Sequence, residues 1–191
     1  MIKYNVHDLF QRMDNDKVKD ISLKLSLPAV LILFNVDGGI NISMAIRSAA
    51  LFGFSDVFIV GRRKRDKRGD VGACNYINVK QIPEINKDFF KDNHLMPIIL
   101  EQNGQSLEEF DFRNYFPKTN SDASKCTISK VAFIVGSEQE GVPSHIKDIS
   151  IPIVTISQYG VMRSFNVAMA ASIVMYEYTR QWRKMILKDK I

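Results

Sequence analysis

Short, continuous apolar runs alternate with helical patterns over most of the chain. Residues 29–36 (AVLILFNV), 56–61 (DVFIVG) and 131–136 (VAFIVG) show no polar alternation, as expected for strands buried on both faces of a parallel sheet. A helical pattern over 42–52 joins the first two runs and stops before Gly53. This strand–helix–strand unit predicts an α/β fold with a mostly parallel sheet flanked by helices.

The remaining segments extend the same pattern. We expect further strands at 76–82, 97–101 and 151–156, short helices at 84–94, 106–116 and 143–147, and a final helix from about Ser164 to Leu187. Residues 6–27 carry apolar positions among charges, which predicts one or two amphipathic helices ended by Pro28. Residues 117–130 lack an apolar pattern and are expected to form a surface loop. We therefore divide the chain into a helical extension, 1–28, and one domain, 29–191.

Composition and charge narrow the class of protein. The 191 residues carry a net charge of +5, which favours a polyanionic partner such as nucleic acid. Cys74 and Cys126 stand far apart and form no metal-binding or disulfide pattern, so reduced thiols in a cytoplasmic protein are expected and no metal is predicted. The N-terminus lacks the apolar segment of a signal peptide, and no apolar run approaches the roughly 20 residues of a membrane span.

A first group of polar residues follows the strand at 29–36. Asn41, Ser43 and Arg47 lie on the turn and first turns of the next helix, where the Asn41 oxygen can cap the helix. Arg47 stands among apolar and small residues, so it either reaches a cleft or partner, or extends to solvent or pairs with a carboxylate. The turn at 37–39 lacks the GxGxxG spacing of a dinucleotide site.

Two further groups also follow apolar strands. Gly136–Gly141 (GSEQEG) contains Glu138, placed to contact a substrate or Arg47, although an ordinary loop with a helix-terminal acid is the alternative. Residues 156–178 (ISQYGVMRSFNVAMAASIVMYEY) bring Ser164 and Asn166 to the start of the last helix, where Ser164 could simply be a cap. Polar loops at the carboxyl ends of parallel strands can meet in one cleft. If these segments were only ordinary connecting loops, there would be little reason for all three to carry polar residues at the same edge.

A basic block follows the second predicted strand. It consists of Arg62, Arg63, Lys64, Arg65, Lys67 and Arg68. Its place on the same sheet edge as the motifs suggests that it binds RNA phosphates, with a strong dependence on salt. A merely solvated loop is the alternative.

Together these residues resemble the SpoU, or TrmH-like, ribose 2′-O-methyltransferases of the SPOUT superfamily. The family pattern N-x-G-x₃-R is similar to residues 41–47, G-x-E-x-x-G to 136–141, and I-P-x-x-G-x₃-S-x-N-V to 156–167, within a resemblance that covers about residues 29–182. Ser43 replaces the family's glycine and is expected to crowd the backbone. Ser157 replaces its proline and is expected to loosen the cofactor loop.

The resemblance implies a fold and partners that the residue pattern does not give. It implies a C-terminal deep trefoil knot, S-adenosylmethionine bound within the knot loops, and an obligate homodimer whose sites are completed at the interface. The apolar last helix, with Met169, Ile173, Tyr176 and Trp182, fits dimer packing or equally the core.

The resemblance also implies residue roles. The catalytic set is Arg47, Asn41, Glu138, Ser164 and Asn166, with Arg47 as the general base or as a group that holds the substrate. Positions matching the family's cofactor contacts are Leu100, Gly136, Ile156 and Ser164. Because the acceptor is a ribose 2′-hydroxyl, the substrate is RNA.

The residues GVMRSFNV and the later EYTRQW most resemble the branch of the family that methylates guanosine 18 of tRNA, and this resemblance implies tRNA as the substrate. The alternatives are an rRNA 2′-O-methyltransferase, a SPOUT enzyme that methylates a base, or a non-catalytic knotted RNA-binding protein.

Overall fold

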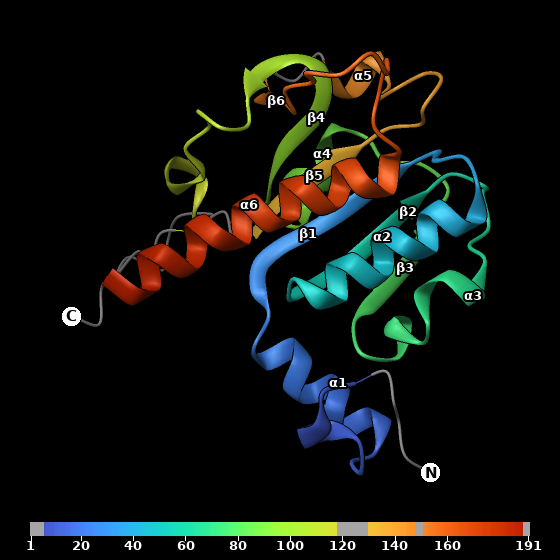
Figure 1. Cartoon of the computed structure of the whole chain (residues 1–191). Helices are drawn as coiled ribbons and strands as arrows, with labels where there is room; N and C mark the ends of the chain where they lie inside the picture. Colours follow the sequence, from blue (N-terminus) through green and yellow to red (C-terminus); the bar gives the residue numbers. More distant parts are fainter. Residues whose placement is uncertain (1–5, 118–129, 148–150, 189–191) are drawn as a thin grey trace.

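The computed structural model describes residues 6–117, 130–147 and 151–188, and its centre is a six-stranded sheet (Figure 1). The strands are β1 (Leu27–Phe34), β2 (Phe54–Val60), β3 (Asn78–Ile82), β4 (Leu95–Ser106), β5 (Lys130–Val135) and β6 (Ile153–Thr155). They lie in the order β3-β2-β1-β5-β4-β6, and all of these neighbouring pairs are parallel. The predicted parallel α/β sheet is confirmed.

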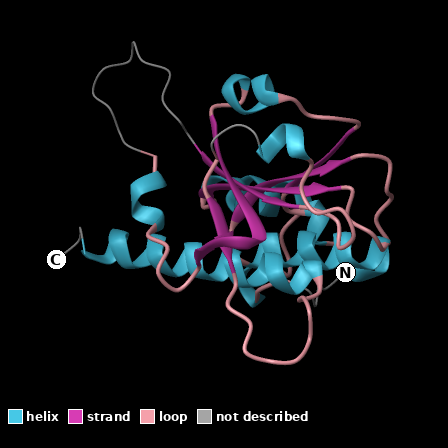
Figure 2. Cartoon of the chain, turned by 90° about the horizontal axis from the view of Figure 1, so that it is seen from above, coloured by secondary structure: helices cyan, strands magenta, loops and turns pink. Residues whose placement is uncertain are grey.

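Helices cover both faces of this sheet (Figure 2). The α-helices are α1 (Asn15–Lys24), α2 (Gly39–Leu51), α3 (Lys67–Asp70), α4 (Lys87–Asp92), α5 (Ser144–Lys147) and α6 (Val167–Lys188), and the short 3-10 turns are η1 (Asp8–Phe10), η2 (Ala73–Asn75) and η3 (Phe112–Tyr115). Alternate residues of β1 serve the two layers. Leu31 and Leu33 pack into the core that includes α2 and α6, whereas Ile32 and Phe34 belong to the core on the α4 and α5 side.

Helices α2 and α6 lie side by side and run in the same direction (Figure 1). Along their shared face, Ser172 Oγ donates to Ser48 Oγ at 2.8 Å, and Thr179 Oγ1 donates to the Phe52 carbonyl at 3.4 Å. Both helices therefore begin at the carboxyl edge of the sheet, where free backbone N–H groups gather.

Tyr178 joins α6 to the centre of the sheet. Its side chain is fully buried among aromatic rings, and its hydroxyl donates to the Pro28 carbonyl at 3.2 Å. Burial raises the pKa of Tyr178 far above its ordinary value, so the phenol stays protonated.

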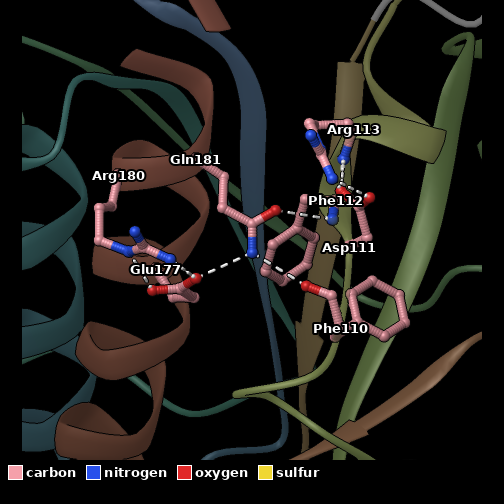
Figure 3. A network of polar contacts seen from close by, with 7 residues as sticks. All are labelled: Phe110, Asp111, Phe112, Arg113, Glu177, Arg180 and Gln181. Atoms are coloured by element: carbon pink, nitrogen blue, oxygen red, sulfur yellow. Dashed lines mark hydrogen bonds and ion pairs between the residues drawn. The ribbon is translucent and has the colours of Figure 1, made fainter. Parts of the chain in front are cut away.

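The segment after β4 is not the helix predicted at 106–116. Strand β4 continues to Ser106, and the only regular element that follows before residue 118 is the short 3-10 turn η3. Phe110, Phe112 and Phe116 are all buried, a spacing that no single helix face provides. Gln181 on α6 accepts from the Phe112 N–H at 2.9 Å and donates to the Phe110 carbonyl at 2.9 Å (Figure 3). At Phe110 and Phe112 the backbone therefore bonds to α6, while the turns of this segment make local bonds such as that from the Glu109 N–H to the Ser106 carbonyl.

Other boundaries also differ from expectation. Helix α1 ends at Lys24, and Pro28 lies inside β1, where the pairing with β2 is irregular between Leu27 and Val30. The last helix begins at Val167 and not at Ser164. Of the expected loop at 117–130, residues 118–129 lie outside the described residues. Within the described ranges, no helix combines the length and apolar character needed to cross a membrane.

Candidate active site

Three segments distant in sequence meet at the side chain of Asn41. Asn41 Nδ2 donates to Glu138 Oε1 at 3.1 Å and to the Asp37 carbonyl at 3.1 Å. Its Oδ1 accepts from Asn166 Nδ2 at 3.0 Å. The start of α2, the loop after β5 and the start of α6 are thus joined in one hydrogen-bonded chain, Glu138–Asn41–Asn166.

Asn166 caps α6, whereas Asn41 does not cap α2. Gly38, with φ of 76°, precedes α2, so Asn41 lies in the first turn of that helix and its oxygen is not used as a cap. Asn166 Oδ1 instead accepts from the N–H groups of Ala168 and Met169, at 2.9 and 3.3 Å. The predicted capping role of Asn41 is wrong, because α2 begins at Gly39, before Asn41.

The loop after β5 is held in a tight hairpin. The Gly141 N–H donates to the Ser137 carbonyl at 2.9 Å, and the Glu140 N–H donates to Ser137 Oγ at 3.1 Å. A Cβ on Gly136 would lie 2.0 Å from the Gly141 backbone, so only glycine fits there. This turn leaves Glu138 exposed and directed toward Asn41.

A cavity of about 520 Å³ opens beside these hydrogen-bonded side chains, at the carboxyl ends of β5 and β6 and next to Leu100 of β4. Its lining includes all four residues proposed for the cofactor, namely Leu100, Gly136, Ile156 and Ser164. It also includes Glu101 and Gln102, which the sequence analysis did not select. The signal for Glu101 was available, since an acid ends the apolar run PIILE at the same sheet edge.

Ser157 follows β6 in the loop that borders this cavity. Its Oγ donates to Glu108 Oε2 at 2.7 Å and lies 3.3 Å from Ser106 Oγ. The hydrogen bonds from Ser106 and Ser157 hold the pKa of Glu108 below its ordinary value. The loop expected to be loosened at Ser157 is therefore attached to the end of β4 by side chains.

Arg47 lies apart from the hydrogen-bonded side chains around Asn41. It lies about 9 Å further along α2, is exposed, and makes no hydrogen bond or ion pair with any described residue. Glu138, expected to fix Arg47, bonds to Asn41 instead. Arg47 shares its exposed helix face with Met44 and Leu51.

Ser43, one helical turn before Arg47 on α2, is completely buried. Its hydroxyl has no hydrogen-bond partner among the described residues. A Cβ added to Gly69 would lie 2.8 Å from the Ser43 Cβ, so the side chain of Ser43 occupies space that this glycine of α3 leaves open.

The basic block lies beside the start of α2. Its backbone is fixed there because the Asp66 N–H donates to the Gly39 carbonyl at 2.8 Å. Half of its cations are already paired, with ion pairs Arg63–Asp37, Arg65–Asp70 and Arg68–Asp66. Within the described part of the chain, the cations of the block that form no ion pair are Arg62, Lys64 and Lys67.

Comparison with known proteins identifies the family. Residues 28–176 match the SpoU rRNA Methylase family. The chain belongs to this family. The resemblance to SpoU methyltransferases is therefore confirmed, and the chain is an enzyme of a methyltransferase family.

Two relatives show how this SpoU protein compares in sequence. A Staphylococcus aureus protein named for the TrmH family of tRNA/rRNA methyltransferases is 27% identical over 185 residues, which cover 93% of this chain and 67% of that protein. A Borreliella burgdorferi tRNA (guanosine(18)-2′-O)-methyltransferase is 27% identical over 147 residues, covering 75% of this chain and 62% of that protein.

Solved SpoU structures share the fold. The A. aeolicus TrmH/SpoU tRNA modifying enzyme superposes with a TM-score of 0.71 at 18% identity, covering 90% of this chain and 83% of that one. AviRb from Streptomyces viridochromogenes, solved with S-adenosylmethionine, superposes with a TM-score of 0.65 at 19% identity, covering 83% of this chain and 58% of the AviRb chain. At these identities the likeness establishes the fold.

Proposed function

We propose that this SpoU protein is an S-adenosylmethionine-dependent RNA ribose 2′-O-methyltransferase that acts on tRNA. The observation that carries the proposal is the chain Glu138–Asn41–Asn166 at the rim of a cavity lined by all four candidate cofactor residues. A non-catalytic RNA-binding protein would not need three polar side chains from separate segments to meet beside such a cavity.

The cavity suits S-adenosylmethionine in size, polarity and charge. About 520 Å³ lies within the range of small-molecule sites. Apolar side chains such as Leu100 and Val135 offer an adenine surface, while the backbone of Gly136 is accessible to polar groups. Carboxylates on the lining outnumber the single guanidinium, that of Arg163, which favours a cationic ligand. When bound, the cofactor supplies an electrophilic methyl group on a sulfonium.

The residues around the cavity then position the acceptor. A ribose hydroxyl is a poor nucleophile, so orientation and removal of its proton dominate the barrier. Asn166 donates a hydrogen bond to Asn41, and Asn41 donates one to Glu138. The carboxylate of Glu138 has further lone pairs, which can accept a hydrogen bond from the ribose hydroxyl. Ser164, exposed at the cavity rim, is placed to contact the adjacent phosphate.

Arg47 serves better as a donor than as a base. A guanidinium is very hard to deprotonate, whereas its N–H groups can stabilise a developing alkoxide. Because Arg47 has no ion-pair partner among the described residues, its charge is available for a substrate phosphate or for a second subunit.

The exposed face of α2 and α6 supports a homodimer. Leu51 and Tyr176 are 76% and 57% exposed, and the two helices form a groove of about 600 Å³ lined by both residues. Exposed apolar patches on soluble proteins mark interaction sites, and Arg47 on the same face of α2 would reach a partner's site. L51E should give a monomer in sedimentation, whereas L25E, at a residue 74% exposed elsewhere, should not. A dimeric L51E would exclude this interface.

The resemblance further implies a deep trefoil knot, in which the C-terminal segment threads a loop. The hydrogen bonds of Gln181 to Phe110 and Phe112 are compatible with it, because they hold α6 against the residues that follow β4 (Figure 3). We expect the knotted domain and the helical extension 1–28 to belong to one cytoplasmic enzyme.

RNA binding is proposed for the basic block. Alanine at Arg62, Lys64 and Lys67 should weaken tRNA binding and flatten its salt dependence, because these cations are not already neutralised. In a one-to-one comparison, alanine at Arg68, which is paired with Asp66, should have a smaller effect than alanine at Lys67 alone. Equal effects of the two changes would rule out selective use of the unpaired cations.

Guanosine 18 of tRNA is the proposed target, supported by the name of the Borreliella burgdorferi relative. An rRNA target is the second candidate, supported by the tRNA/rRNA designation of the Staphylococcus aureus relative. Labelled S-adenosylmethionine incubated with bulk tRNA or rRNA, followed by mapping of the labelled nucleotide, decides between them. Transfer to a base and not to a ribose would refute the proposal.

A further inference from the structure

Glu101 ends the apolar part of β4 and lines the candidate cofactor cavity. Its Oε1 accepts from the Val142 N–H at 2.9 Å and forms an ion pair with Lys147 Nζ at 2.9 Å. Val142 is buried, so its N–H has no ready access to water if this acceptor is lost. One carboxylate thus attaches both the end of the Gly136–Gly141 loop and helix α5 to the central sheet.

The loop backbone is shaped around this carboxylate. Gly141 has φ of 66°, and a Cβ at this position would lie 2.4 Å from Glu101 Oε1. The close approach therefore requires glycine for two reasons, the left-handed backbone and the space taken by the carboxylate. Gly136 and Ser137 of the same loop form one wall of the cavity.

The other side of the loop carries Glu138. Since Glu138 accepts from Asn41, the loop connects the cavity wall to the hydrogen-bonded chain at the rim. We infer that Glu101 is a positioning residue, which fixes the 136–142 loop so that cofactor binding and the orientation of Asn41 depend on one anchor. This inference rests on the proposed function.

Substitutions separate the hydrogen bond from the ion pair. Glu101→Gln keeps an oxygen for the Val142 N–H and loses only the charge, while Lys147→Met removes the ion pair and leaves the anchor. Glu101→Ala removes both. Because a buried N–H without an acceptor is costly, the loop in E101A should move until the Val142 N–H reaches water. Binding must then restore the loop, which should weaken the binding of S-adenosylmethionine about ten-fold or more. E101Q and K147M should stay within about three-fold.

Calorimetry on the full chain tests this with two ligands. Loss of the anchor should weaken S-adenosylmethionine and its neutral product S-adenosylhomocysteine equally, because the loop position affects both. Weakening of the cationic ligand alone would overturn the inference and show that Glu101 recognises charge. Wild-type affinity in E101A, or E101Q as weak as E101A, would also overturn it.

Hydrogen exchange of the Val142 amide supplies a measurement without ligand. The amide should be protected in the wild type and in E101Q, and should exchange much faster in E101A, in which the amide has lost its acceptor. Unchanged protection in E101A would overturn the anchoring. Failure of the wild type to bind S-adenosylmethionine would refute the proposed function, whereas the exchange result would still decide whether Glu101 holds the loop.

Discussion

The hydrogen bonds of Asn41 make it the most informative residue to change. Asn41→Ala removes the contacts to Glu138 and Asn166, at 3.1 and 3.0 Å, as well as the local contact to the Asp37 carbonyl. Each hydrogen bond has a net worth of about 1 kcal/mol. Losing the two contacts between segments should therefore reduce kcat/KM by about ten- to a hundred-fold, since each 1.4 kcal/mol is a factor of ten.

Asn41→Asp tests the same contacts by charge. The new carboxylate keeps an acceptor for Asn166 but faces Glu138 Oε1, which lies 3.1 Å from the present amide nitrogen. Two like charges at this distance repel by about 1 kcal/mol even in water. Activity should therefore fall below that of N41A, and an N41D variant as active as N41A would show that Glu138 does not face this position.

Ser48→Ala is the matched control. It removes one 2.8 Å hydrogen bond between the same two helices, α2 and α6, but away from the cavity. Methyl transfer from labelled cofactor to bulk tRNA should change by less than about three-fold in this variant, with melting curves reporting the fold of each protein. If N41A and S48A lose the same activity, Asn41 contributes only to helix packing and the assigned site is refuted.

Three further predictions concern stability. Burial opposes ionisation of Asp56, but hydrogen bonds and the charge of Lys130 outweigh burial and lower the pKa of Asp56. The pair therefore stabilises the fold above about pH 4, and this contribution is lost as the pH falls. In urea unfolding, the wild type should lose its stability advantage over D56N in acid. Gln181→Ala leaves two backbone groups unpaired and should cost about 2 kcal/mol, seen as a melting point lower by roughly 4–8 °C. Ser43→Ala removes a buried hydroxyl without a described partner and should leave the melting point unchanged or raise it, whereas a clear loss would reveal a hidden hydrogen bond.

Strands and sheet class were predictable because the strands are buried on both faces. Such strands consist of continuous apolar runs, and the parallel connections need helices between them. The strand order was not predictable, since β6 pairs with β4 through contacts that no local pattern encodes. The predicted helix at 106–116 was wrong for the same reason, because backbone groups of Phe110 and Phe112 bond to Gln181, which is distant in sequence.

The site was predictable at the level of segments but not of atoms. Spacing after apolar strands placed the segments of Asn41, Glu138 and Asn166 at one sheet edge, where the structure brings them into contact. The sequence could not show that Asn166 caps α6 whereas Asn41 does not cap α2, because each helix begins about three residues from its expected start. Nor could it show the pairing of Arg63 with Asp37, which lies in a different loop.

The two departures from the family pattern illustrate why motif spacing is insufficient. Ser43 fits because Gly69, on another helix, has no side chain to oppose it. Ser157 lacks the ring that fixes a proline backbone, yet Glu108 and Ser106 bond to it from the end of β4. Each replacement is thus accommodated by a residue from a different part of the chain, which a motif cannot include.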